Sequence, residues 1–341
     1  MTSIATLGSH CALQVLKGAK DEGFKTVLVC EKKREKLYRR YGFIDEFVLV
    51  DSFLEVTDQK CASKLKDEDA IIIPHGTMIS QMDSSQIESI KTPIFGNKLI
   101  LRWESDRNMK EKLMLESKLN IPKSIASPKD IKNLVIAKRH GAAGGKGYFL
   151  TTSEKDYKKK RDKLISQGLI KGDSDLYLQE YSFGVPTYLQ YFYSPLKGEL
   201  EFFGADRRYE SDIDGLARIP APQQIEIDLT PSFNVMGNIP IVLRESLLDE
   251  VYSMGERFVE ASKRLVSPGM NGPFCLEGVY DENGKFTAFE FSARIVAGTN
   301  LYIDGSPYST FLYNEPMSMG RRIAREIKEA KKANELTKIV T

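Results

Sequence analysis

The chain has 341 residues, of which 41% are hydrophobic and 28% are charged. This length favours two or three domains, and the composition is that of an ordinary globular protein. The 49 basic and 47 acidic side chains leave a formal charge of only +2. Such a balance excludes the strong net field that favours binding to nucleic acid or to an acidic membrane surface. We therefore expect neither nucleic acid nor membrane as a partner.

The cysteines and the N-terminal segment indicate the compartment. Cys11, Cys30, Cys61 and Cys275 show neither paired spacing nor a C-x-x-C motif, so we expect reduced thiols rather than disulfides or a zinc site. No apolar run approaches the ~18 residues needed to span a bilayer. The start of the chain, MTSIATLGSH, lacks the positive charge and the long apolar core of a signal peptide. A cytoplasmic protein is predicted.

Residues 1–97 alternate short apolar segments with helical ones. Several apolar segments are continuous runs of Val, Ile and Leu, as expected of parallel strands covered on both faces. The pattern predicts an open, doubly wound α/β sheet, in which ligands bind beyond the carboxyl ends of the strands. The expected strands are Ile4–Leu7, Thr26–Cys30, Phe47–Val50, Ala70–Ile73 and Pro93–Phe95, and the expected helices are Cys11–Glu22 and Arg34–Tyr41.

Two loops at these strand ends carry candidate ligand groups. Gly8-Ser9-His10 leads into a helix, and His75-Gly76-Thr77 follows the strand that ends at Ile73. Such turns present free backbone N–H groups, which favour an anion. The alternative is that Ser9 or Thr77 merely caps a helix.

The histidines share one sequence context. The chain has only three, His10, His75 and His140, and each lies within a residue or two of a glycine, just past an expected strand. A random surface distribution would rarely place all three in this way. We therefore expect at least one of them to contact a ligand.

Two long helices are predicted from their charged, amphipathic patterns. Leu99–Leu119 contains the only tryptophan and should end before Pro122, because the residue before a proline leaves the helical region. Prolines and polar residues up to Pro128 then indicate a linker. The second helix, Arg321–Lys332, carries mixed charges and is expected to be solvated surface.

The next domain opens with the strand Asn133–Lys138, followed by HGAAGGKGYFL. Four of the seven residues in Gly141–Gly147 are glycine, so the backbone can approach a polyphosphate closely and form an anion-binding nest. The Walker pattern G-x-x-x-x-G-K-[ST] is absent, and the strand–loop–strand flanks favour a flexible cover over phosphates. An ordinary glycine-rich hairpin turn is the alternative. Lys138 and Lys146, at its two ends, favour phosphate contact.

Three further segments each carry a weak signal. The strand Asp175–Tyr181 ends in Gln179-Glu180-Tyr181, which could offer backbone hydrogen bonds to a base edge and a carboxylate to a ribose. Gly204–Glu210 has two arginines and a glutamate, suited either to phosphate and sugar contacts or to a salt-bridged edge. Asn238 lies in the polar segment Asn234–Pro240, read as a loop, where it either caps a turn or binds a ligand amide.

The segment Pro273–Arg294 predicts two strands joined at Asn283-Gly284, because Asn-Gly between apolar runs favours a two-residue type I′ turn. That turn would place Glu277 directly opposite Glu290. Opposed carboxylates repel each other, unless a divalent cation that prefers hard oxygen ligands, such as Mg²⁺, lies between them. A solvated face with two stray acids is the alternative.

Strand alternation assigns the side chains of this hairpin to two faces. One is apolar, with Phe274, Leu276, Phe289 and Phe291; the other carries Cys275, Glu277, Ala288, Glu290, Ser292 and Arg294. If repulsion dominates, the substitution Glu277→Gln leaves the fold as stable as before or slightly more so.

The chain resembles the ATP-grasp superfamily, in which an α/β domain, a glycine-rich lid after a strand-end lysine and paired late glutamates occur in this order. More narrowly, GSHCAL, PHGT, KRHGAAGGKGYF, DRRYES and FEFSARIVAGTN resemble segments of the archaeal formate-dependent synthetases of 5-formamidoimidazole-4-carboxamide ribonucleotide (FAICAR). The resemblance spans nearly the whole chain. It implies an N-terminal open parallel α/β domain (1–97), a connecting helix and linker (98–130), a glycine-rich lid subdomain (131–200) and a C-terminal mixed-sheet domain with a metal-binding hairpin (201–341).

The resemblance also implies roles for individual residues. It gives Glu277 and Glu290 as metal ligands and Arg294 as a catalytic residue that stabilises charge during transfer. Thr77 stands where we expect a serine, and Ser292 where the superfamily often has asparagine. The implied positions for the imidazole substrate are His10, Thr77 and Asn238. Those for ATP are Lys138, His140, Gly141, Gly144, Gly145, Lys146, Gly147, Gln179, Glu180, Tyr181 and Glu210.

The implied reaction converts 5-aminoimidazole-4-carboxamide ribonucleotide (AICAR), formate and ATP into FAICAR, ADP and phosphate, in purine (IMP) biosynthesis. Phosphorylation to formyl phosphate would give formate a good leaving group, and positioning of the weakly nucleophilic amine should supply much of the acceleration. Mg²⁺ or Mn²⁺ and a homo-oligomer, a hexamer by family analogy, are also implied. Two alternatives stay open: another ATP-grasp carboxylate–amine ligase, and a non-catalytic nucleotide-binding regulator, which the retained glutamates disfavour.

Overall fold

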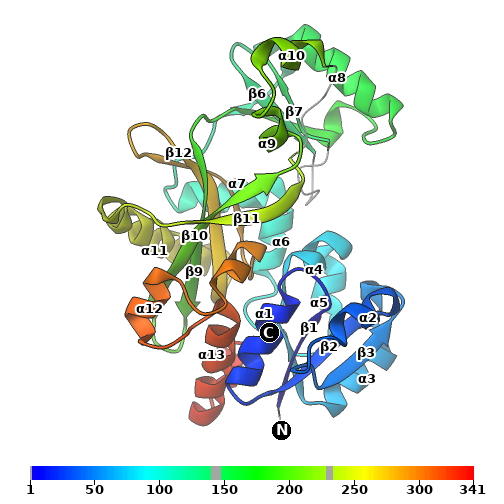
Figure 1. Cartoon of the computed structure of the whole chain (residues 1–341), viewed down its shortest axis with the longest axis vertical. Helices are drawn as coiled ribbons and strands as arrows, with labels where there is room; N and C mark the ends of the chain where they lie inside the picture. Colours follow the sequence, from blue (N-terminus) through cyan, green and yellow to red (C-terminus); the bar gives the residue numbers. More distant parts are fainter. Residues whose placement is uncertain (1, 140–146, 228–232) are drawn as a thin grey trace.

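The computed structural model describes residues 2–139, 147–227 and 233–341, which form three β-sheets surrounded by helices (Figure 1). The N-terminal sheet and a small sheet built from residues 124–180 lie at opposite ends of the molecule, and a five-stranded sheet lies between them (Figure 1). Within these described ranges, no helix is long and apolar enough to cross a membrane.

The N-terminal sheet is parallel throughout, as predicted. Its order is β3-β2-β1-β4, with β1 (Ser3–Leu7), β2 (Lys25–Glu31), β3 (Glu46–Val50) and β4 (Ala70–Ile72). The expected strand 93–95 is reduced to single bridges, one of which pairs Ile94 with Ile72. The expected helix 34–41 is reduced to a 3₁₀ turn and four α-helical residues. The α-helices of this region are α1 (Ala12–Asp21), α2 (Glu35–Tyr38), α3 (Gln59–Asp67), α4 (Gly76–Gln81) and α5 (Ser84–Ser89).

The predicted helix Leu99–Leu119 is two helices, α6 (Ile100–Ser105) and α7 (Arg107–Glu116). Asp106 between them has extended backbone (φ −90°, ψ 123°), and its side chain accepts a hydrogen bond from the N–H of Met109 at 2.9 Å. An aspartate in this geometry is a helix N-cap, so the residue that breaks the first helix also begins the second. The apolar pattern alone did not reveal this break.

The small sheet is antiparallel, in the order β5-β8-β6-β7. It consists of β5 (Ser124–Ile125), β6 (Val135–Arg139), β7 (Phe149–Thr151) and β8 (Leu176–Glu180), and α8 (Glu154–Ser166) packs against it. The sheet differs from the expected lid range of 131–200 at both ends. Strand β5 precedes that range, and β9 (Val185–Ser194) belongs to the five-stranded sheet.

The five-stranded sheet is also antiparallel, in the order β11-β10-β9-β12-β13. Its β11 (Val235–Ile241) falls in the segment that was predicted as a polar, glycine-containing loop. Gly237 and Pro240 suit an edge strand, where proline is tolerated. The other strands are β10 (Glu199–Glu210), β12 (Gly272–Tyr280) and β13 (Phe286–Ser292). The remaining α-helices are α9 (Ile213–Leu216), α10 (Ala221–Glu226), α11 (Leu248–Leu265), α12 (Pro307–Tyr313) and α13 (Met319–Ala333).

The β12–β13 hairpin pairs Glu277 with Glu290 as predicted, but by another route. Gly284, with φ +75°, donates its N–H to the carbonyl of Asp281, and Asp281 donates to the carbonyl of Lys285. These bonds close a three-residue loop that ends in a left-handed glycine, not a two-residue turn. A β-bulge after Glu277 then shifts the register back by one residue.

The bulge corrects the predicted faces of β13. Phe289 is the extra residue, and it packs beside Tyr188, Cys275 and Val296 rather than on the apolar side with Phe274. Conversely, Ala288, predicted on the polar side, lies fully buried in the main hydrophobic core. The longer loop shifts the register by one residue and the bulge shifts it back, so the glutamates remain paired. Ala288 and Phe289, however, lie on the faces opposite to those predicted.

Helix α13 was predicted to be solvated, yet it is anchored by buried charge. Arg322 is fully buried and pairs with Glu201 of β10 and with Glu326, each at 2.8 Å, while its guanidinium lies 4.2 Å from the ring centre of Phe192. At the contact with α1, a Cβ added to Gly18 would lie only 2.1 Å from a backbone nitrogen of α13. Close backbone contact thus attaches α13 to α1 of the N-terminal domain, and a buried ion pair attaches it to β10 of the five-stranded sheet.

The buried Arg322 gives a stability prediction. Arg322→Ala leaves Glu201 and Glu326 without their cation, and breaking a buried pair from one side costs about 3–5 kcal/mol. We expect a clear drop in the thermal unfolding midpoint of the apo-protein. Lys17→Ala, which removes an exposed helix pair with Asp21, should leave the midpoint almost unchanged. Equal midpoints for Arg322→Ala and the unsubstituted chain would contradict the assignment.

Candidate functional site

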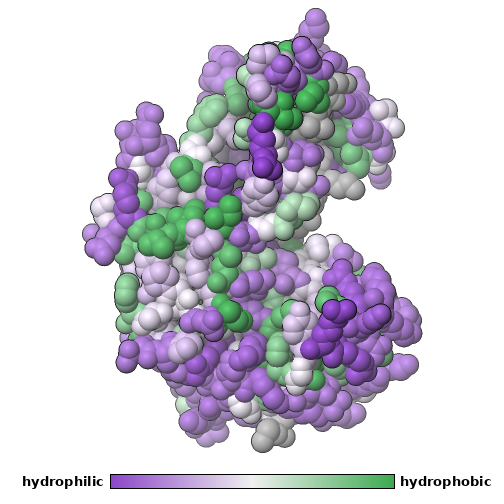
Figure 2. Space-filling model, viewed as in Figure 1, coloured by the Kyte–Doolittle hydropathy of each residue, from purple (hydrophilic) through white to green (hydrophobic). Residues whose placement is uncertain are grey.

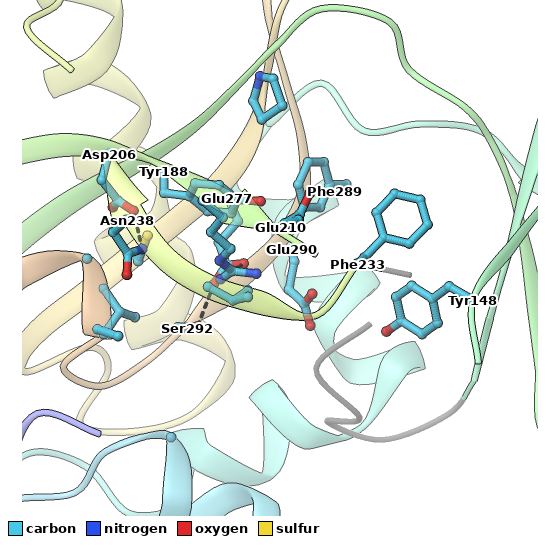
Figure 3. A pocket seen from close by; sticks show the side chains of 18 of the residues that line it. Tyr148, Tyr188, Asp206, Glu210, Phe233, Asn238, Glu277, Phe289, Glu290 and Ser292 are labelled. Atoms are coloured by element: carbon cyan, nitrogen blue, oxygen red, sulfur yellow. Dashed lines mark hydrogen bonds and ion pairs between the residues drawn. The ribbon is translucent and has the colours of Figure 1, made fainter. Parts of the chain in front are cut away.

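A cavity of about 770 Å³ is lined by residues of all three sheets and their loops, and Figure 2 shows the surface notched between the N-terminal domain and the small sheet. Among its walls, Figure 3 shows Glu210, Glu277 and Glu290 between an aromatic end, with Tyr148 and Phe233, and a polar end, with Asp206 and Asn238. Eleven of the site residues expected from the sequence line it: His10, Thr77, Lys138, Gln179, Glu180, Tyr181, Glu210, Asn238, Glu277, Glu290 and Arg294.

The remaining expected residues belong to the glycine-rich loop. Gly147 has φ +81° and lies against the side chain of Arg139, so that a Cβ added there would be 2.8 Å from Cδ of Arg139. It is not among the described residues that line the cavity. His140, Gly141, Gly144, Gly145 and Lys146 lie outside the described residues.

The opposed glutamates are each held by a separate cation. Glu277 is buried, and it accepts hydrogen bonds from Arg208 of β10 at 2.6 Å and from the hydroxyl of Ser292 at 2.7 Å. Glu290 pairs with Lys110 of α7. Burial works to raise the pKa of Glu290, but Lys110 and other nearby cations outweigh it and hold that pKa well below its usual range. Both carboxylates are therefore neutralised from elements outside the hairpin.

The two glutamates also have the chemistry of a divalent-metal site. Mg²⁺ is usually bound through one or two carboxylates together with substrate phosphates and water, rather than in an all-protein cage. The described residues contain no group of three or more His, Cys, Asp or Glu side chains placed to hold a metal. Two facing carboxylates on a cavity wall fit a metal that arrives with a phosphate ligand.

Lys138 lies in the cavity wall and forms no ion pair with a carboxylate of the described residues. Its Nζ donates to Oε1 of Gln179 at 3.0 Å and lies 5.1 Å from the ring centre of Phe289. Burial, together with the nearby cations Arg107 and Lys110, lowers the pKa of Lys138 to about 8. Its environment therefore makes the ammonium form less favourable than it is in water, although the amine still carries its proton below about pH 8.

The end of β8 offers fewer hydrogen bonds than expected. The side chain of Gln179 is occupied by Lys138 and by the carbonyl of Pro122. The N–H groups of Glu180 and Tyr181 donate to backbone carbonyls. The carbonyl groups beyond the strand remain for a base edge, together with the N–H of Ser182, which donates to no other described residue.

Glu210, at the end of β10, lies half-buried in the cavity wall. Burial and the neighbouring Asp214 raise its pKa to about 7, against the opposing effect of Arg208. Near neutral pH its carboxyl group is thus divided between the ionised and the protonated form.

The first-domain loops bring two neutral histidines together. His75, not Thr77, caps α4: its Nδ1 accepts the N–H of Thr77 at 3.2 Å, and its Nε2 donates to a β1 carbonyl. Ser9 does not cap α1, which has no side-chain cap among the described residues. His10 stacks on His75 with ring centres 5.5 Å apart. Desolvation lowers the pKa of His75 to about 4, and desolvation with nearby Arg294 lowers that of His10 still further. Both rings are neutral at physiological pH.

Arg294 faces this loop from beyond β13. Its Nη2 pairs at 3.0 Å with Glu104 of α6, and Nη1 donates to the carbonyl of Ile295. Its buried Nε has no partner among the described residues. Glu104 in turn accepts the N–H of Ala293 at 2.8 Å, so α6 fixes both the backbone and the charge at this corner.

Several cavity residues were missed from the sequence. Lys110 and Glu104 lie on helices that were predicted as one charged amphipathic helix, so nothing marked these two side chains as inward-facing. Arg208 was noted only as one of two arginines suited to phosphate contact or to a salt-bridged edge, and its structural partner is Glu277. Asp206 had no signal, because its role depends on the β10–β11 pairing that was read as a loop.

Comparisons with known proteins find relatives along the whole length of this chain. Residues 156–341 match a family described as "Domain of unknown function (DUF1297)", and residues 4–125 match "Protein of unknown function (DUF1246)". A Nitrosopumilus maritimus protein named 5-formaminoimidazole-4-carboxamide-1-(beta)-D-ribofuranosyl 5'-monophosphate synthetase is 68% identical over 341 residues, covering 100% of both chains. A protein of the same name from Methanocaldococcus jannaschii is 47% identical, covering 99% of this chain and 95% of its own.

Solved structures agree. The crystal structure of an IMP biosynthesis protein, PurP, from Thermococcus kodakaraensis matches with a TM-score of 0.80 and 30% identity, covering 99% of this chain and 100% of that one. The ADP complex of an N5-carboxyaminoimidazole ribonucleotide synthetase matches with a TM-score of 0.68, covering 95% of this chain and 76% of its own. At 12% identity the second likeness shows the fold alone.

The pairing of Glu277 with Arg208 reverses the earlier expectation for Glu277→Gln. Relief of repulsion between the glutamates would stabilise the fold, but the substitution also deprives a partly buried guanidinium of its carboxylate. Hydrogen bonds to charged groups contribute about 1.5–3 kcal/mol each. We therefore expect a lower urea midpoint for the ligand-free Glu277→Gln protein. An unchanged or raised midpoint would show that repulsion between Glu277 and Glu290 dominates.

Proposed function

This chain belongs to the family of 5-formaminoimidazole-4-carboxamide ribonucleotide synthetases, and on that premise we propose how its cavity carries out the reaction. The predicted ATP-grasp fold is confirmed, and so is the predicted ATP-dependent ligase of IMP biosynthesis from the FAICAR synthetase family. AICAR and formate as its specific substrates are part of the proposal. Mg²⁺ as the metal, the individual residue roles, a homo-hexamer and a cytoplasmic location are proposals.

One observation carries the residue roles: the opposed glutamates, Lys138 and the His10 and Thr77 loops line the same cavity. In a doubly wound sheet, ligands bind beyond the carboxyl ends of the strands, and His10 and Thr77 follow β1 and β4 there. The imidazole nucleotide would bind at this end, and ATP between the small sheet and the hairpin. The transferred group would then pass between the two within one cavity.

At the ATP end, Lys138 is suited to the phosphates because, within the described part of the chain, it would give up only an amide hydrogen bond and no ion pair. Glu277 and Glu290 would hold Mg²⁺, which supplies charge neutralisation to the phosphates when bound. Gln179, Glu180 and Tyr181 would border the adenine through backbone groups, and Glu210 would contact the sugar or phosphate side. The lid residues Gly141–Gly147 are proposed to cover the phosphates.

At the imidazole end, His10 would act as a neutral ring, because its lowered pKa excludes an imidazolium at physiological pH. Thr77 offers a hydroxyl, and Asn238 an amide. Arg294 is the cation at this end. Its Nε–H, which has no partner among the described residues, suits the negative charge that would develop on the formyl oxygen as the amine attacks formyl phosphate and phosphate leaves. Exclusion of water matters because formyl phosphate hydrolyses readily.

The activity itself is tested by ADP release. With AICAR, formate and ATP together, we expect ADP in stoichiometric amount with FAICAR, which a coupled spectrophotometric assay and chromatography measure separately. Omission of AICAR or formate should reduce release to background. Release that needs an amine but accepts another acid would support the alternative ligase, and nucleotide binding without any release would support the regulator.

The lowered pKa of Lys138 gives a pH prediction. The amine is charged below about pH 8 and loses its charge as the pH rises through that value, so the attraction to phosphate weakens at alkaline pH. We expect the Kd for ATP, measured by titration calorimetry, to rise between pH 7 and 9.5. In Lys138→Arg the charge persists over this range, and the rise should be largely absent. The same rise in both proteins would contradict the role of Lys138.

A further inference from the structure

Asp206 of β10 lines the cavity but was not predicted as a site residue. It is only 1% exposed, and it makes no ion pair with any described residue. Its two oxygens instead accept hydrogen bonds from neutral amides: Oδ2 from Nδ2 of Asn238 at 2.7 Å, and Oδ1 from Nε2 of Gln190. Burial raises the pKa of Asp206 to about 6, so at neutral pH the group is a buried carboxylate held by amide donors.

An ionised carboxylate can only accept hydrogen bonds, so the amide atom of Asn238 that faces it must be nitrogen. Asn238 lies on the edge strand β11, diagonally across from Asp206 in the β10–β11 pairing. Figure 3 shows the Asn238 amide bonded to Asp206 through its nitrogen, with the oxygen turned away. Its Oδ1 accepts no hydrogen bond from another described residue and is therefore the group that Asn238 presents to the cavity.

Packing prevents Asp206 from turning away. A Cβ added to Gly298 would lie 2.0 Å from Oδ1 of Asp206 and 2.5 Å from Nε2 of Gln190, so the 3₁₀ segment Ala297–Tyr302 presses directly on the pair. Gln190 is fully buried, and its Oε1 has no partner among the described residues. The hydrogen bond from Gln190 to the carboxylate therefore leaves the amide oxygen of Gln190 unsatisfied, which costs free energy. Such an exception calls for an explanation, and the required position of the carboxylate supplies one.

We propose that Asp206 is a positioning residue that fixes the amide of Asn238, so that its Oδ1 accepts an N–H group of the imidazole substrate. The inference rests on the proposed function, since AICAR carries N–H donors on its amine and its carboxamide. A site that presents a fixed acceptor favours a substrate with an amine or amide at that place over an analogue that lacks it. Asp206 acts through Asn238, without needing to touch the substrate.

Two other roles are possible for the same acid, and they predict different behaviour. A purely structural link between β9, β10 and β11 would affect ATP and AICAR binding alike. A role for the negative charge itself would be lost in Asp206→Asn. The positioning role needs only an acceptor toward Asn238, which the asparagine oxygen supplies, while its new NH₂ group can donate to the free Oε1 of Gln190.

The test compares AICAR and ATP binding by titration calorimetry, and the KM values for both, in the full-length protein. In Asp206→Leu we expect the Kd and KM for AICAR to rise about 10- to 100-fold, the loss typical of a hydrogen bond to a charged partner, with ATP values nearly unchanged. Asp206→Asn should stay close to the unsubstituted protein. Asp45→Asn, which removes a hydrogen-bonded carboxylate outside the cavity wall, serves as the matched control.

A double-mutant cycle tests whether Asp206 acts through Asn238. Asn238→Ala should raise the Kd for AICAR as much as Asp206→Leu does, and the combined variant should be no worse than either alone. Additive losses, equal losses for ATP, or unchanged AICAR binding in Asp206→Leu would overturn the proposal.

A charge exchange keeps the proposal testable if Asp206→Leu does not fold. Asn238→Asp sets two carboxylates against each other and should weaken AICAR binding. Adding Asp206→Asn to it places an NH₂ donor at position 206 against the new carboxylate at position 238, whose other oxygen can again accept from the substrate. AICAR binding should then recover at least tenfold. Failure to recover would count against the positioning role. ADP release that does not depend on AICAR, in the unsubstituted protein, would refute the proposed function rather than the positioning role. Calorimetric titration of AICAR without ATP distinguishes these two outcomes, because it measures AICAR binding independently of the reaction.

Discussion

The constraint on which the cavity depends is the pair of carboxylates, the buried Glu277 and the half-buried Glu290, that face each other across the β12–β13 hairpin. Removal of a charge from water is costly unless a partner compensates for it. The partners come from different elements, Arg208 from β10 and Lys110 from α7. The hairpin, the neighbouring strand and the connecting helix are thereby held in one arrangement by the chemistry of the site.

The same pairing explains why one cation behaves differently from the others. Four cations line the cavity in its described part: Lys110, Lys138, Arg208 and Arg294. Three of them are matched one to one with Glu290, Glu277 and Glu104, whereas Lys138 has only the amide oxygen of Gln179. The unmatched ammonium group is the one whose pKa falls. It is also the one that an incoming phosphate can neutralise without breaking an existing ion pair.

How much the sequence revealed depended on whether a feature was local. The parallel N-terminal strands were predicted from continuous apolar runs, and the two glutamates were paired correctly. Yet Asn283-Gly284 suggested the wrong turn, and a bulge at Phe289 that no local pattern signals restored the pairing. Most of the expected site residues came from the family resemblance. What it did not supply were the partners: Lys110 and Asp206 act through contacts that form only when distant segments meet.

The buried charged groups of this protein thus depend on partners that the local sequence does not reveal. Arg322 was misjudged on α13 for the same reason as Lys110 on α7, since an amphipathic charge pattern does not distinguish an ion in water from one in an internal pair. The ion pairs of Arg322 and Lys110 differ in whether a ligand can reach them and replace one partner. Arg322 faces protein on all sides and is fixed, whereas the Lys110–Glu290 pair borders the cavity. A metal ion at Glu290 would compete with Lys110 for the same oxygens, and a displaced ammonium group would be left beside the phosphates.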